Sequence, residues 1–112
     1  MPVNPEYRDY VLEQLGCLGG VTGRTMFGGV GISLDRVFFA LIANDVLYFK
    51  VDDSNRGDYE TAGMAPFKPY PTRNTTMPYY EVPVSVLEDV DQLTAWGRKA
   101  YAVGLRNGPR SA

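Results

Sequence analysis

Three apolar runs separated by two-residue polar joints constrain the fold of this chain more than any other feature. The runs cover residues 26–34, 37–43 and 46–51, with Asp35-Arg36 and Asn44-Asp45 between them. Runs of this length, rich in Val, Ile, Phe and Tyr, are typical of β-strands, and two-residue joints are typical of tight hairpins. The sequence therefore predicts three consecutive strands in an antiparallel meander.

Helical patterns flank the predicted meander. Asn4-Pro5-Glu6 is a helix-start signal, and apolar residues then recur at three- and four-residue spacing, which predicts a helix over residues 5–18. A short helix is expected after Asp52-Asp53-Ser54, ending at Gly63, and a longer one around Trp96 after the capping pattern that begins at Asp89. The short turn expected before that last helix starts at Ser85.

The sequence of residues 77–83 predicts one more strand, and its prolines favour a position at the edge of the sheet. The predicted order is α-β-β-β-α-(β)-β-α, in one α+β domain over residues 1–112 with an ordered core from about residue 5 to residue 106. We expect a curved antiparallel sheet packed by helices in two layers.

The composition excludes several classes of function. The 112 residues are 45% hydrophobic and 21% charged, which suits one globular domain. The chain has no histidine, so Ser-His, Cys-His and imidazole–metal sites are excluded, and no catalytic, metal or cofactor site is expected. A net charge of −2 weighs against direct DNA binding.

The location of the protein follows from the same composition. Cys17 is the one cysteine, so no internal disulfide can form and a cytoplasmic location is the simplest expectation. We expect no secretory signal and no membrane association, because the apolar runs are far shorter than the roughly 20 residues that span a bilayer.

A glycine-rich run, Gly28-Gly29-Val30-Gly31, follows Arg24 and Phe27. One interpretation is a loop whose backbone N–H groups bind an anion, together with Arg24 and Lys50. The favoured interpretation is a β-bulge or bend within the first strand, because the run lies beside a strand that leads into another strand.

Several polar side chains have structural interpretations that we favour. Cys17 lies near a helix C-terminus, where the dipole disfavours a thiolate, so an inert thiol is expected. The acids Asp52, Asp53, Asp58 and Glu60 lack the frame of a calcium loop and are expected to cap and solvate a helix. Strand alternation places Lys50 on the face of Tyr48, with its stem over apolar surface and its ammonium in water.

Aromatic side chains near the predicted edge strand provide a candidate partner contact. Alternation sends Tyr79 and Tyr80 to opposite faces of the strand, so at least one is expected in the core and the other can contact a partner. The candidate interaction surface comprises Arg24, Phe27, Gly28, Gly29, Lys50, Tyr79 and Tyr80.

The ordered set of short motifs resembles the N-terminal domain of the TfoX/Sxy family. The motifs are residues 24–31, 39–41, 48–52, 63–67, 77–83 and 93–100, in an order that covers residues 7–102. The resemblance implies a two-layer α-β(3)-α-β(2)-α fold similar to that of type III secretion chaperones, with a strand within residues 67–76. Two-domain family members are bacterial regulators of competence-gene expression that act with the cyclic-AMP receptor protein. Their C-terminal helical domain has no counterpart here, so the resemblance implies a stand-alone domain.

The leading hypothesis is a non-enzymatic regulatory or protein-interaction module, with a protein partner or a second copy in a homodimer. The alternative is a small-molecule or anion-binding domain that uses Arg24, Lys50 and the backbone of Gly28 to Gly31. That alternative requires these groups to converge on one pocket. Direct DNA binding is the least favoured of the three.

Overall fold

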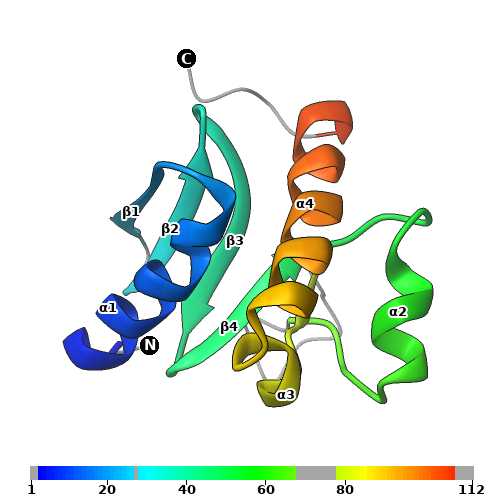
Figure 1. Cartoon of the computed structure of the whole chain (residues 1–112), viewed down its shortest axis with the longest axis horizontal. Coiled ribbons are helices and arrows are strands. Elements are labelled where there is room, and N and C mark those ends of the chain that lie inside the picture. The colour runs from blue at the N-terminus through cyan, green and yellow to red at the C-terminus, as the bar shows by residue number, and fades with distance from the viewer. Residues whose placement is uncertain (1–2, 27, 68–77, 108–112) are drawn as a thin grey trace.

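The computed structural model describes residues 3–26, 28–67 and 78–107 and has an α+β fold, as expected. Five strands form one antiparallel sheet in the order β1-β2-β3-β4-β5, and α1 and α4 lie on the same face of it (Figure 1). None of the described helices is long and apolar enough to cross a membrane. In chain order the elements are α1 (Pro5–Leu15), the 3-10 turn η1 (Gly16–Leu18), β1 (Val21–Met26), β2 (Gly29–Leu34), β3 (Val37–Ala43), β4 (Val46–Lys50), α2 (Arg56–Thr61), β5 (Tyr79–Glu81), α3 (Val84–Leu87) and α4 (Val90–Asn107).

The helices begin and end at the residues that local chemistry favours. The Asn4 side chain accepts a hydrogen bond from the Glu6 N–H at 2.8 Å, directly before α1. The Asp89 carboxylate accepts from the N–H groups of Asp91 and Gln92, which confirms the predicted start of α4. The Gln92 side-chain amide also donates to this carboxylate at 2.9 Å, and this bond first, with those from the two N–H groups, lowers the pKa of Asp89. Gly63 follows α2 with a φ of +76°, as expected of a residue after a helix C-terminus.

Both predicted hairpins are confirmed. Asp35 and Arg36 have φ angles of 51° and 67°, and Asn44 and Asp45 have 51° and 57°. Positive φ at both central residues defines the type I′ turn, whose twist matches that of the strands it joins. β3 and β4 therefore pair directly, with Ala43 opposite Val46.

The first predicted strand, over residues 26–34, is confirmed only from Gly29 to Leu34, because residues 21–34 form two strands, of which β1 was not predicted. Met26 of β1 pairs with Gly29 of β2, and Gly28 between them has a φ of +79°. The glycine-rich run thus begins with a hairpin turn that reverses the chain, not with a bulge within one strand. Four strands precede α2, instead of three.

A bulge does occur, but further along the sheet. Ile32 pairs with Ala40 and Ser33 pairs with Phe38, so Phe39 is the extra residue on β3. A bulge of this kind breaks the alternation of side chains. Phe39 and Ala40 are consecutive and both are buried, at 0% and 1% exposed, so the bulge adds an aromatic ring to the core.

The strand predicted within residues 67–76 lies outside the described residues, except for Phe67. Its neighbour Pro66 forms a single antiparallel bridge with Tyr80 of β5. β5 is shorter than the predicted 77–83, and it does end the five-stranded sheet.

The core lies between the sheet and the helices α1 and α4. Two glycines seven residues apart on α4 allow this helix to approach its neighbours closely. A Cβ at Gly97 would lie 2.7 Å from Leu18 Cδ1, and a Cβ at Gly104 would lie 2.7 Å from the Phe38 carbonyl oxygen. The largest fully buried side chains include Tyr59, Phe39, Phe49, Leu15, Ile32, Ile42, Leu47 and Leu93.

We expect Gly104→Ala to destabilise the protein although alanine favours helix. The new Cβ would meet a backbone carbonyl of β3, so α4 must shift, and overpacking of this kind costs about 1–3 kcal/mol. Gly57→Ala in α2 is the matched control, because nothing lies within 4 Å of its Cβ position. It should stabilise by up to about 1 kcal/mol. Urea unfolding measures both, and a Gly104→Ala variant as stable as wild type would contradict the close approach of α4.

Candidate functional site

The sequence-predicted site residues that the structure describes lie toward opposite ends of the sheet. Arg24 is on β1 and Gly28 and Gly29 are at the β1–β2 turn, whereas Lys50 is on β4. Three strand spacings separate β1 from β4, which is roughly 14 Å at the usual ~4.8 Å per strand. The predicted anion site of Arg24, Lys50 and the glycine backbone is therefore not formed. Phe27 lies outside the described residues.

At the β5 edge, both tyrosines are half-buried. Tyr80 pairs with Phe49 and faces the helices, where its ring centroid lies 5.7 Å from that of Tyr59. Tyr79 lies on the opposite face beside Lys50, whose Nζ is 6.0 Å from the ring centroid of Tyr79. Burial raises the pKa of Tyr79 and lowers that of Lys50. The two tyrosines thus face opposite sides, as predicted.

The outer edge of β5 is already hydrogen-bonded. Phe67 N–H donates to the Tyr79 carbonyl at 2.7 Å, and Glu81 N–H donates to the Ala65 carbonyl at 3.1 Å. The Phe67 ring also lies 4.8 Å from that of Tyr48 on the same side of the sheet. The segment 65–67 therefore occupies the edge that the sequence had suggested as an open contact surface.

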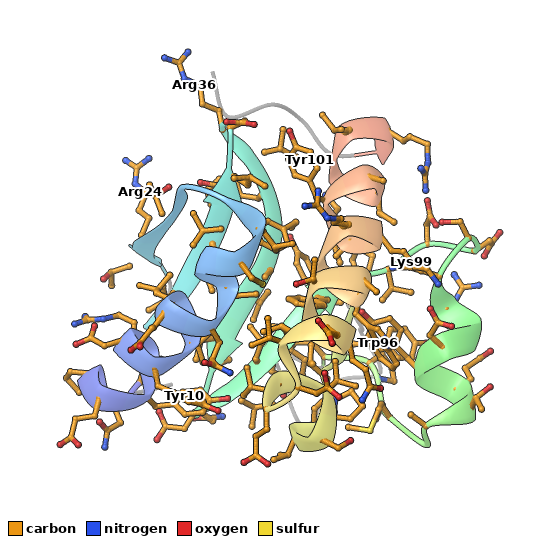
Figure 2. The ribbon with its side chains drawn as sticks, in the orientation of Figure 1. Tyr10, Arg24, Arg36, Trp96, Lys99 and Tyr101 are labelled. Carbon is orange, nitrogen blue, oxygen red and sulfur yellow. The ribbon has the colours of Figure 1, made fainter. Side chains whose placement is uncertain are left out.

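At the other end of the sheet, four consecutive residues of β1 are exposed, from Thr22 to Thr25. We call residues 22–25 the β1 edge. Among the described residues, β1 pairs only with β2. In Figure 2 the labelled Arg24 side chain projects away from the molecule at this edge.

Turn geometry determines which backbone groups of the β1 edge face outward. A two-residue turn joins Met26 to Gly29, so this pair is hydrogen-bonded, and bonded pairs then alternate along the ladder. Gly23 and Thr25 consequently direct their N–H and C=O groups away from β2. The N–H of Val21, the next residue in this set, donates to the Gly19 carbonyl at 2.9 Å and not to β2, which agrees with this alternation.

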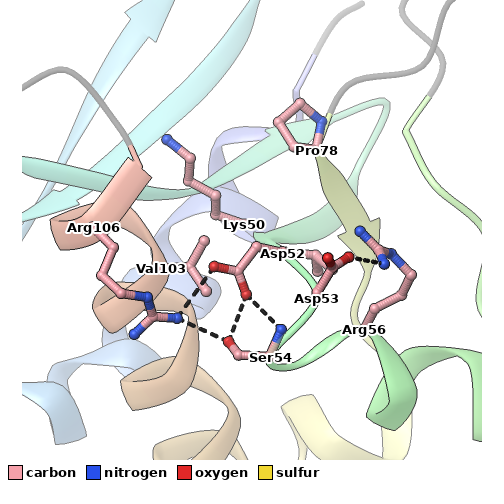
Figure 3. Close-up of a pocket in the computed structure, with 9 residues that line it drawn as sticks. Lys50, Asp52, Asp53, Ser54, Arg56, Pro78, Val103 and Arg106 are labelled. Atoms are coloured by element: carbon pink, nitrogen blue, oxygen red, sulfur yellow. Dashed lines mark hydrogen bonds and ion pairs between the residues drawn. The ribbon is translucent and has the colours of Figure 1, made fainter.

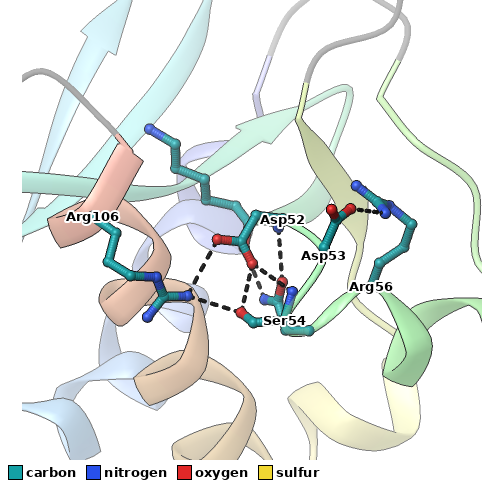
Figure 4. Close-up of polar contacts among 7 residues, drawn as sticks. Asp52, Asp53, Ser54, Arg56 and Arg106 are labelled. Carbon is teal, nitrogen blue, oxygen red and sulfur yellow. Dashed lines mark hydrogen bonds and ion pairs between the residues drawn. The ribbon is translucent and has the colours of Figure 1, made fainter.

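A cleft of about 820 Å³ lies between α4 and the segment that follows β4 (Figure 3). Arg106 of α4 donates to Asp52 at 3.2 Å and to the Ser54 hydroxyl at 2.8 Å. Asp52 also accepts hydrogen bonds from the Ser54 N–H and hydroxyl (Figure 4). The residues that line the cleft are Lys50, Val51, Asp52, Asp53, Ser54, Arg56, Pro78, Val103 and Arg106.

Most charged side chains of this cleft pair with one another, and they do not point together toward one place where a ligand could bind. Asp53 forms an ion pair with Arg56, and Lys50 points away from the ion pair of Asp52 with Arg106 (Figure 3). The arrangement fastens the turn at residues 52–54 to α4. No group of three or more potential metal ligands occurs within the described residues.

The predicted capping role of the acids holds in part. Asp52 caps the turn through the Ser54 N–H, but the residue before α2 is Asn55. The buried Asn55 side chain makes no bond to the helix; it donates to the Lys50 carbonyl and accepts from the Asp52 N–H. Asp58 forms an ion pair with Lys99 of α4 at 2.9 Å. Cys17 is half-buried, with its sulfur 3.0 Å from the Thr94 hydroxyl.

An aromatic cluster around Tyr59 was not singled out by sequence reasoning. Tyr59 is 1% exposed and its ring centroid lies 4.8 Å from that of Trp96, which anchors α2 beside α4. The Tyr59 hydroxyl is buried and has no hydrogen-bond partner among the described residues. Burial, with a contribution from the Asp58 carboxylate, raises the pKa of Tyr59 far above its ordinary value. No local pattern distinguishes this tyrosine, because the cluster joins three separate elements.

Comparison with known proteins identifies a family for most of the chain. The family model described as the TfoX N-terminal domain matches residues 13–103 of the 112 residues. The match covers β1 to β5 and most of α4, so it includes both edges of the sheet. No curated protein matches the sequence.

We expect Tyr59→Phe to match or exceed the wild type in stability. At neutral pH the substitution removes an unpaired buried hydroxyl, so the free energy of unfolding should be equal or higher by up to about 1 kcal/mol. Above pH 10 the unfolded phenol ionises while the folded one stays protonated. Wild-type stability then falls by about 1.4 kcal/mol per pH unit through this group, and the variant lacks that loss.

Urea unfolding between pH 7 and pH 11 measures this difference. Tyr10→Phe, at a tyrosine 39% exposed, is the control for loss of a solvated hydroxyl and should change the free energy of unfolding at pH 7 by less than about 0.5 kcal/mol. A Tyr59→Phe variant less stable than wild type at pH 7 would show that the hydroxyl has a partner.

Proposed function

The chain belongs to the TfoX N-terminal domain family, and from that premise we propose that it is a non-enzymatic regulatory module that binds another protein. The observation that carries this proposal is the exposed β1 edge. Gly23 and Thr25 offer backbone groups there that no described residue pairs, as inferred from the strand register. Proteins commonly use such an edge to add a strand from a partner.

The contrast between the two edges supports this surface. The segment 65–67 covers the backbone of β5, whereas residues 22–25 remain exposed. Natural proteins tend to protect edge strands because bare edges invite pairing. An edge that no described residue covers over four positions therefore supports an intended contact there.

The polar groups of the cleft support a role without catalysis. The Ser54 hydroxyl bonds directly to a carboxylate and to a guanidinium that are themselves paired, and the sequence has no histidine to act between them. A nucleophile aligned with a general base would be needed for hydrolytic chemistry. The net charge of −2 supports a protein partner over DNA.

The process and the location form the finer part of the proposal. We propose that the module acts in the control of transcription, as the resemblance to the competence regulators suggests, and that it works in the cytoplasm. The single cysteine supports a reducing location.

Capture of partners by immobilised protein tests the proposal. Thr25→Pro removes the outward N–H and places a ring against any incoming strand, but it spares the bonds to β2. We expect wild type to retain at least one protein from cells that contain the chain, and Thr25→Pro to retain it at least ten-fold less. Mass spectrometry of the retained proteins provides the measurement.

Val84→Pro is the matched control, because Val84 is 63% exposed at the first position of α3, where proline fits. Circular dichroism should show that both variants are folded. If wild type retains no protein above the level of empty resin, the proposal of a protein-interaction module fails. If Thr25→Pro retains the same proteins as wild type, they bind elsewhere than at the β1 edge.

A further inference from the structure

We infer that the β1 edge is built for an antiparallel strand of a different protein, with the pattern apolar–acidic–apolar opposite Gly23, Arg24 and Thr25. This inference rests on the proposed function, because it names the chemistry of the partner at the same surface. Three observations support the inference. The charge of Arg24 favours an acidic residue opposite it, the apolar neighbours of Gly23 favour apolar flanking residues, and the register that a second copy would need disfavours self-association.

Arg24 lies midway between the two outward-facing residues of the edge. A strand bonded to Gly23 and Thr25 would place one residue directly opposite Arg24, in the closer type of antiparallel pair, with Cα atoms about 4.5 Å apart. Arg24 has no hydrogen bond or ion pair to any described residue, and its side chain projects outward, as does that of Arg36 in the next turn (Figure 2). An Asp or Glu opposite Arg24 would complete a cross-strand ion pair.

The flanking positions face the helix side of the sheet. Gly23 pairs with the buried Ile32, and a Cβ at Gly23 would lie 3.1 Å from Val30 and 3.3 Å from Leu12 of α1. Residues of an added strand opposite Gly23 and Thr25 would point to this same side, since paired residues share a face. There they would extend the apolar contact beneath Leu12, which is itself partly buried against the core. Apolar side chains suit both positions.

A second copy of this chain fits the same edge poorly. If two copies of β1 paired antiparallel about a twofold axis, the register that uses all the outward N–H and C=O groups of Gly23 and Thr25 would be centred on Arg24. It therefore sets Arg24 directly opposite its own copy, and like charges there are destabilising. A register centred on Gly23 would avoid this contact, but it would pair Thr25 with Val21, whose N–H already donates to Gly19. Both registers confined to residues 21–25 therefore disfavour a second copy, and on this ground we infer a foreign strand.

Binding of short peptides to the full chain tests the inference. The probes are fluorescein-labelled peptides of sequence Ser-Thr-Val-X-Val-Thr-Ser, in which X is Glu, Gln or Lys. Their binding is measured by fluorescence anisotropy at low salt. We expect the Glu peptide to bind about five-fold more tightly than the Gln peptide, the upper end of a cross-strand charge pair, and the Lys peptide to bind weakest. Amide NMR shifts should be largest at Gly23 and Thr25.

Two variants and one control make the test specific. Arg24→Glu should reverse the order of the Glu and Lys peptides, Thr25→Pro should abolish binding of all three, and Val84→Pro should bind as wild type does. Equal binding of the Glu and Lys peptides, an order unchanged in Arg24→Glu, or no binding of any peptide would each overturn the inference. A wild-type dimer in sedimentation that Thr25→Pro dissociates would overturn it too.

The two proposals can fail separately. One outcome is that Thr25→Pro abolishes capture of a partner while the peptides show no charge preference. This outcome would support the proposed interaction module and overturn the inferred chemistry of its partner. No capture by wild type at all would defeat the proposed function itself.

Discussion

The close approach of α4 to the sheet is the constraint on which the rest of the structure depends. Gly97 and Gly104 lie on one face of α4 and leave no room for a side chain against Leu18 and the β3 backbone. Because packing at this distance fills the space above β3 and β4, Phe39 and Phe49 become fully buried beneath the helix. The bulge in β3 belongs to the same arrangement, because it turns Phe39 toward α4 and its Tyr101 ring.

With its helices on one face, the sheet is left with two unlike edges. Segment 65–67 bonds to β5, and the turn at residues 52–54 is fastened to α4 through Arg106. This end of the molecule is thus closed by internal contacts, including the aromatic cluster of Tyr59, Tyr80 and Trp96. At the opposite end, β1 meets no further strand among the described residues. Because β5 is covered and β1 is not covered by any described residue, the β1 edge is the candidate surface for a partner.

Sequence patterns predicted much of the fold where the signal was local. A helix that begins at Pro5, the strands β3 and β4 and both two-residue hairpin joints follow from capping residues and apolar runs. The helix predicted over residues 5–18 is an α-helix only to Leu15, and Gly16–Leu18 form a 3-10 turn. β1 escaped prediction because Gly23, Arg24 and its threonines lack the apolar alternation of a half-buried strand. The glycine-rich run was misassigned for a related reason: Gly28 suits a turn and a bulge equally well, and only pairing partners distinguish the two.

The sequence by itself determined the class of the fold, most of its elements and the family, because capping, turn chemistry and short motifs act between neighbours along the chain. Only the tertiary structure decided which candidate residues meet. Arg24 and Lys50 are separated because three strand spacings lie between β1 and β4. Tyr79 and Tyr80 are half-buried, because segment 65–67 bonds to the backbone of β5 and Tyr59 of α2 packs against Tyr80. Such distances depend on strand order and packing, which no local pattern encodes.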